Sequence, residues 1–151
     1  MLSAASPILL TSTGRWSTMQ RDGVKERIIS QWLEKAEQDL KAAEALASGE
    51  TFLYFPACFH AQQAVEKFLK ALLTDLQVEF PKTHSIEYLI QLLKPHFPAL
   101  PPVLLDAMDL SHFAVETRYP GDLPEPGREE TLEAIQIAIK VKERVLGILG
   151  R

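Results

Sequence analysis

The stretch Phe59-His60-Ala61-Gln62-Gln63-Ala64-Val65-Glu66-Lys67-Phe68-Leu69-Lys70-Ala71-Leu72-Leu73 decides the fold of this chain. Successive side chains of a helix are about 100° apart, and at that spacing most apolar residues of the stretch share one broad arc. The arc contains Cys58, Ala61, Ala64, Val65, Phe68, Leu69, Ala71, Leu72 and Leu76. A helix with so wide an apolar arc is largely surrounded by other helices. The other side chains are polar and form either a water-facing strip or the floor of a site; they are Gln62, Gln63, Glu66, Lys67, Lys70 and Thr74.

Four more segments show helical spacing of apolar residues, and prolines or glycines separate them. The predicted helices cover residues 24–47, 55–76, 86–93, 103–116 and 129–149. No segment has the pattern of a strand, so the sequence predicts an all-α, up-and-down helical bundle of about five helices. The predicted core contains Trp32, Leu40, Val65, Phe68, Leu72, Leu89, Met108, Ile135 and Ile139. Along residues 103–116, one stripe is expected to contain Leu104, Met108, Ser111 and Val115.

The chain is expected to form one domain after a short tail. Residues 1–22 have weak periodicity and many Ser and Thr residues, which predicts a flexible N-terminal segment. Residues 23–151 then form the bundle. A chain of 151 residues with 46% apolar content can build a core without metal or disulfide support. We therefore predict neither a metal site nor a cofactor.

Composition also limits the compartment and the partners. Cys58 is the only cysteine and lies on the apolar arc, so it is predicted to be a small core residue in a cytoplasmic protein. The longest apolar runs are far shorter than the roughly 20 residues that cross a bilayer, so no membrane insertion is expected. The net charge of −4 argues against an extended nucleic-acid coat, because nonspecific phosphate binding needs a basic surface. A local basic patch is still compatible with it.

Two single polar residues have more than one interpretation. Asp39 lies beside the apolar stripe of the first predicted helix. It reaches either water or a nearby hydroxyl, or else the polar stripe of the second helix, because a buried carboxylate needs a partner. His60 is expected at the surface or at the edge of the core, since no second His or Cys stands at metal-ligand spacing.

Three blocks of sequence together resemble the HEPN domain family. They are Gln62 to Leu73, then Lys82-Thr83-His84-Ser85, then Thr117-Arg118-Tyr119-Pro120, and they occur in the family's order. The resemblance extends from about Trp32 to about Leu149. It implies a small all-helical domain that forms homodimers. The family includes ribonucleases, partners of nucleotidyltransferases and members without established chemistry, so the resemblance implies the fold more strongly than an activity.

The ribonuclease members of that family carry an arginine followed four to six residues later by a histidine. Here no arginine precedes any of the four histidines at that spacing, and the corresponding positions hold residues such as Phe55, Glu79, Gln91 and Ala107. General acid–base cleavage needs a positioned proton donor or acceptor. RNA cleavage is therefore not the favoured function.

The side chains suited to a ligand are mostly cations from three segments. The candidate ligand- or phosphate-binding residues are Lys67, Lys70, Lys82, His84, Arg118 and Tyr119. Cations that a bundle brings to one face can bind phosphate, and Tyr119 could stack on a base. Alternatively, Glu66 and Lys70 form an ordinary surface pair four residues apart, and Lys82 is simply solvated.

These residues favour a nucleotide- or phosphate-binding module. The HEPN resemblance implies that such a module can be the partner of a minimal nucleotidyltransferase, in a toxin–antitoxin-like pair, and that it forms a homodimer. The alternative is a ribonuclease with a nonstandard site, whose acid or base is His84 or His60. Both a binding protein and an enzyme are compatible with the sequence.

Overall fold

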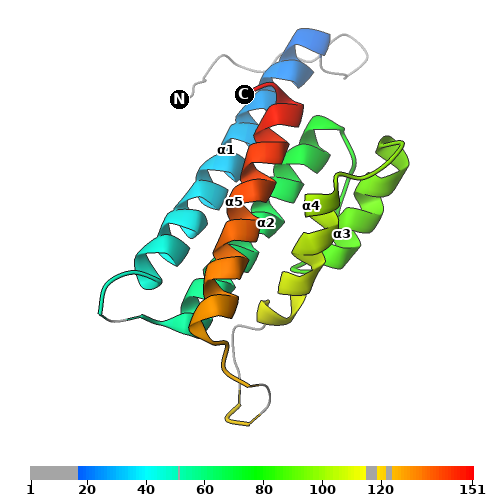
Figure 1. Ribbon diagram of the computed structural model, residues 1–151. Helices are drawn as coiled ribbons and strands as arrows, with labels where there is room; N and C mark the ends of the chain where they lie inside the picture. The colour runs from blue at the N-terminus through cyan, green and yellow to red at the C-terminus, as the bar shows by residue number, and fades with distance from the viewer. Residues whose placement is uncertain (1–16, 51, 115–118, 122–123) are drawn as a thin grey trace.

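The computed structural model describes residues 17–50, 52–114, 119–121 and 124–151 (Figure 1). The α-helices are α1 (Thr18–Leu46), α2 (Tyr54–Asp75), α3 (Ile86–Leu93), α4 (Pro102–Asp106) and α5 (Arg128–Leu149), and two 3-10 helices, η1 (Lys94–His96) and η2 (Ala107–Phe113), follow α3 and α4. Within these ranges the chain has five α-helices and no strand, which confirms the predicted all-α fold.

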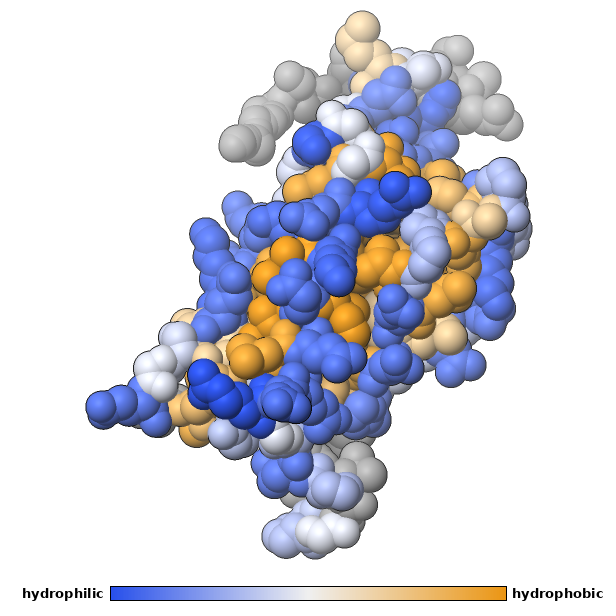
Figure 2. All heavy atoms as spheres, in the orientation of Figure 1, coloured by the Kyte–Doolittle hydropathy of each residue, from blue (hydrophilic) through white to orange (hydrophobic). Residues whose placement is uncertain are grey.

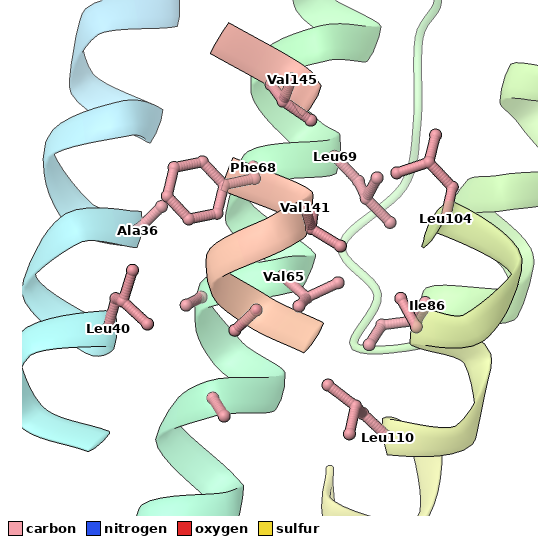
Figure 3. Packing of buried hydrophobic residues seen from close by; sticks show 14 of the residues in the cluster. Ala36, Leu40, Val65, Phe68, Leu69, Ile86, Leu104, Leu110, Val141 and Val145 are labelled. Carbon is pink, nitrogen blue, oxygen red and sulfur yellow. The ribbon is translucent and has the colours of Figure 1, made fainter. Parts of the chain in front are cut away.

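Helix α2 is the centre of the bundle. Both α1 and α5 pack chiefly against α2 rather than against each other, and α3 and η2 also contact it. Figure 3 shows Phe68 of α2 directed toward Ala36 of α1, while Val65 and Leu69 lie on the side of Ile86 and Leu104. The wide apolar arc of this helix is thus buried on several sides, as the sequence predicted.

Six of the nine predicted core residues are buried. They are Leu40, Val65, Phe68, Leu72, Leu89 and Ile135. The other three, Trp32, Met108 and Ile139, are only half-buried. No helix in the described part of the chain is both long enough and apolar enough to span a bilayer.

Helix α1 begins earlier than the sequence predicted. Ser17 is its N-cap: the Ser17 Oγ accepts a hydrogen bond from the Gln20 backbone N–H at 3.2 Å, and Gln20 Oε1 accepts one from the Ser17 N–H at 2.8 Å. This reciprocal pair satisfies backbone donors that have no partner inside the helix. Residues 18–22, predicted to belong to the flexible tail, are therefore helical, and residues 1–16 lie outside the described part of the chain.

The fourth predicted helix, residues 103–116, is different in detail. After α4 the chain tightens into the 3-10 helix η2, which has three residues per turn. Accordingly Leu104, Ala107, Leu110 and Phe113 are buried at intervals of three. Of the predicted stripe, Leu104 is buried, Met108 is half-buried and packs against the core, Ser111 is half-buried, and Val115 lies outside the described residues.

The segment between α2 and α3, residues 76–85, runs back along α2, and we call it the return loop. The backbone N–H of Val78 donates to the Leu73 carbonyl at 2.9 Å. The carbonyls of Thr83 and His84 accept hydrogen bonds from side chains of α2 that come before Leu73 in the chain. Gln77 has φ of 58°, in the left-handed region, where the chain leaves the helix and reverses. The return loop thereby brings His84 to the middle of α2.

Candidate functional site

The polar stripe of α2 is mostly buried, so the first of its two interpretations, a water-facing strip, is wrong for most of its length. Gln62 is fully buried, and Gln63, Glu66 and Lys70 are also in the buried class. Lys67 is half-buried. Because buried polar and charged groups need partners, this stripe has to be internally hydrogen-bonded.

Glu66 is the centre of one half of the stripe. Its carboxylate accepts hydrogen bonds from Lys70 Nζ at 2.7 Å and from Gln63 Nε2 at 3.3 Å, and His84 Nδ1 lies 3.0 Å from Oε2. The side chains of Glu66 and Lys70 are only 2% and 7% exposed. A carboxylate accepts and does not donate, so Nδ1 of His84 carries the proton and the other ring nitrogen is left for a different partner.

Asp39 of α1 is the centre of the other half. Its carboxylate accepts a hydrogen bond from Lys67 Nζ at 2.6 Å, and His60 Nδ1 lies 2.8 Å from Oδ1. The second interpretation of Asp39 is therefore confirmed, since its carboxylate faces the polar stripe of α2. The side chain of His60 is 34% exposed, as expected for a histidine at the edge of the core.

Gln63 joins the two halves into one polar network. Its Oε1 accepts from Lys67 Nζ at 3.3 Å, and its Nε2 donates to Gln62 Oε1 at 2.8 Å as well as to Glu66. The polar network consists of Asp39, His60, Gln62, Gln63, Glu66, Lys67, Lys70 and His84. Each half contains one carboxylate that holds one lysine and one histidine.

The polar network also fixes the return loop. Lys70 Nζ donates to the Thr83 carbonyl at 2.9 Å, and Gln62 Nε2 donates to the His84 carbonyl at 3.1 Å. These side chains supply the donors that a strand or helix would otherwise give to backbone carbonyls. Ser85, whose Oγ accepts from the Tyr88 N–H at 3.1 Å, then caps α3. His84 is thus held through both its backbone and its ring.

Two aromatic rings border the polar network beside Lys70. The Lys70 ammonium lies 5.2 Å from the ring centroid of Trp32 and 5.9 Å from that of Phe80. The centroids of the two rings are 6.2 Å apart, and Phe80 also lines a surface pocket together with Glu79 and Pro81. Rings at this distance add a cation–π attraction to the ion pair of Lys70.

The structure brings three of the six predicted site residues into the polar network. Lys67 and Lys70 point to carboxylates, and His84 has an exposed ring, 66% accessible, on the same network. Lys82 is exposed two residues before His84. Tyr119 is exposed and precedes α5 in the chain. Arg118 lies outside the described residues.

The sequence did not place Asp39 and Glu66 among the site residues, although they hold both histidines. For Glu66 the sequence did contain a signal: a carboxylate in the middle of a helix with so wide an apolar arc has little access to solvent and therefore needs a partner. No sequence pattern marks the carbonyls of Thr83 and His84, because every residue has a carbonyl.

Cys58 does not belong to this site. It is buried, and its Sγ donates to Thr131 Oγ1 at 3.5 Å, while Thr131 donates to the Gly127 carbonyl at 2.8 Å. Burial raises the pKa of the Cys58 thiol above its ordinary value, with a smaller opposite effect from the bond to Thr131. Its predicted place as a small core residue is confirmed. In the described ranges, no group of three His, Cys, Asp or Glu side chains is arranged to hold a metal ion.

Comparison with known proteins identifies the family. The HEPN domain model matches residues 29–148, which is most of the chain. The chain belongs to the HEPN domain family. The resemblance carried by the three sequence blocks is thereby confirmed, and the matched range agrees with the one that they indicated.

Two solved structures are similar to this HEPN domain. One is the crystal structure of ST0689, described as an archaeal HEPN homologue, with 30% identity, a TM-score of 0.61 and coverage of 79% of this chain and 95% of the other. The other is the crystal structure of TT1696 from Thermus thermophilus, with 30% identity, a TM-score of 0.65 and coverage of 78% and 94%. No curated protein sequence matches the chain. Both structures cover a share of this chain similar to the share that the domain model matches.

Proposed function

We propose that this HEPN domain is a binding module for a nucleotide or another phosphate ligand, with its main contacts on the return loop. One observation carries the proposal: the exposed ring of His84 is anchored by the buried Glu66–Lys70 pair, and exposed Lys82 stands two residues away. Groups whose positions are fixed before binding lose less conformational freedom when a ligand arrives. Tyr119, which is exposed, would stack on a base, and Arg118 would add a cation.

Lys67 and Lys70 have a different part in this proposal from Lys82 and His84. Each of the two ammonium groups already donates to a carboxylate at 2.6 or 2.7 Å, so its charge is compensated inside the protein. Their contribution to binding is to keep the polar network and the return loop in place. Replacing either one would therefore weaken binding through loss of structure.

Titration calorimetry with ATP and other nucleotides tests the proposal. Lys82→Ala and Arg118→Ala should each weaken binding and reduce its dependence on salt, because each removes one cation from the ligand's surroundings. Lys140→Ala, at an exposed position of α5, is the matched control and should leave the affinity unchanged. Binding that none of the contact variants changes, or no nucleotide binding at all, would refute the proposal.

We further propose a homodimer, and a minimal nucleotidyltransferase as partner chain in a toxin–antitoxin-like pair. Membership of the HEPN family and exposed apolar side chains support an association surface. Figure 2 shows apolar surface between polar patches on the face where α5 and α4 lie, and Leu105 and Leu132 of these helices are 42% and 44% exposed. Light scattering at micromolar concentration in low and moderate salt should give the mass of a dimer. The mass of a monomer would contradict the homodimer.

A ribonuclease is the second candidate, and the two carboxylate–histidine pairs favour it. A carboxylate that holds Nδ1 orients an imidazole for proton transfer at its other nitrogen, as general acid–base catalysis requires. An RNA-degradation assay on the same preparation separates the candidates. A ribonuclease should lose turnover on His84→Ala, whereas a binding module should show no turnover in the unchanged protein.

A further inference from the structure

The charges of the polar network cancel inside the protein. The two lysines, Lys67 and Lys70, each pair with one carboxylate, that of Asp39 or of Glu66. With both imidazoles neutral, the two positive and two negative charges sum to zero. Lys67 and Lys70 also have small exposed fractions, 18% and 7% of the side chain. The network therefore presents no uncompensated cation from these lysines to an anionic ligand.

The two histidines are the parts of the polar network that are most accessible. Their side chains are 34% exposed for His60 and 66% exposed for His84. Each uses Nδ1 toward its carboxylate, which leaves Nε2 as the atom that can meet a ligand. In a neutral imidazole of this tautomer, Nε2 is an acceptor and repels the oxygen of an anion. After protonation the same atom is a donor with a positive charge.

We infer that His60 is a second anion contact, equivalent to His84, and that an anion binds at each of these histidines only with the uptake of a proton. The inference rests on the proposed phosphate-binding function and adds a residue and a chemical condition to it. The ligand class is an oxyanion, such as a phosphate group, because an imidazolium N–H donates to such oxygens. Affinity should then rise as pH falls, by about tenfold per pH unit for each proton taken up.

The groups around each histidine support this coupling. His60 faces Asp39 of α1, which also holds Lys67 of α2, and the ring of Phe59 lies 5.5 Å from it. A proton on His60 would therefore be added next to a carboxylate whose charge is shared with a single lysine.

His84 has the corresponding surroundings on the return loop. It faces Glu66 of α2, which also holds Lys70, and exposed Lys82 is two residues before it in the chain. In both cases the added proton would give the network a net positive charge at the surface, where an anion can compensate it.

Nitrogen NMR of the imidazole rings during a titration with ATP tests the inference directly. The protein is held at a pH at which the rings of His60 and His84 are neutral without ligand, which the same spectra establish. At saturation with ATP, the Nε2 signals of both should move to the position of a protonated ring. His96, exposed on η1 and outside the polar network, is the internal control and should stay neutral.

Variants and pH give a second readout. His60→Gln and His84→Gln should each weaken ATP binding at the replaced ring and remove the dependence on pH, about tenfold per pH unit, that the proton on this ring contributes. His96→Gln should change neither. ATP binding with both rings neutral, or with a proton on His84 only, would overturn the inference and leave the proposed function standing. Absence of any ATP binding would overturn both.

Discussion

Removing the charge of Lys70 is the sharpest test of the structural argument. In Lys70→Ala the Glu66 carboxylate, 2% exposed, loses the ammonium that lies 2.7 Å from it. The Thr83 carbonyl loses its donor at the same time. The His84 ring and Gln63 would be left as the hydrogen-bonding partners of Glu66. The substitution thus leaves a buried negative charge with weaker compensation.

The expected loss of stability follows from that burial. Breaking a buried ion pair by removing one partner costs about 3–5 kcal/mol, because the other charge stays buried. A solvated pair four residues apart on a helix would cost only about 0.3–0.5 kcal/mol. In a domain of this size, each kcal/mol corresponds to about 2–4 °C in Tm, so Lys70→Ala should lower Tm by about 6–20 °C. The difference between the two cases is well above the error of the measurement.

Urea denaturation followed by circular dichroism, at several protein concentrations, gives the free energy of unfolding. Lys140→Ala is the control and should change it by no more than about 0.5 kcal/mol. The double variant Glu66→Gln with Lys70→Met removes both charges and retains similar volume. It should be more stable than Lys70→Ala, because no buried charge is left unpaired. A loss below about 1 kcal/mol for Lys70→Ala would refute the conclusion that the pair is buried.

Three further predictions concern other parts of the bundle. Phe68→Ala should cost about 3–5 kcal/mol in urea denaturation, because the ring is fully buried; a cost near 1 kcal/mol would contradict the packing around it. Ser17→Ala should cost about 0.5–2 kcal/mol and lower the helical signal of α1, since it removes the capping box; Ser48→Ala, which removes only a hydrogen bond from an exposed hydroxyl to the Ala45 carbonyl, serves as its comparison. Because burial raises the pKa of Cys58 above its ordinary value, a thiol reagent at mildly alkaline pH should modify it slowly in the native protein and rapidly in urea. Because the folded state favours the neutral thiol, Cys58 contributes its full share to the free energy of unfolding below the pKa of the unfolded thiol, and this share decreases as pH rises above that pKa. Rapid modification of the native protein would contradict the burial of Cys58.

The sequence predicted the helices well where one period extends over several turns. Each end of α2, α3 and α5 differs from its predicted position by at most one residue, and α2 is the central helix. The prediction was poorer where the local geometry changes. A capping box can extend a helix into residues without apolar periodicity, as at Ser17, and a 3-10 turn shifts which side chains face the core, as at Ala107.

The candidate site was predicted only in part, and the reason is the return loop. Glu66 and Lys70 have the same spacing whether they are solvated or buried, so the pattern fits both cases. What buries them is the packing of Thr83 and His84 against α2, and the loop that carries these residues has no periodicity from which its path could be read. His84 was recognised because of the family resemblance, whereas its carboxylate partner was not.

The bridge made by Asp39 has a consequence for how α1 is aligned along α2. A slide of α1 by one turn, about 5.4 Å, would move Ala36 away from the place where it is buried and bring a larger side chain, such as Leu40, to that place. After such a slide Asp39 would lose both His60 and Lys67, and a largely buried carboxylate would stand without a cation. The apolar packing and the ionic contacts of Asp39 therefore favour the same alignment of the two helices.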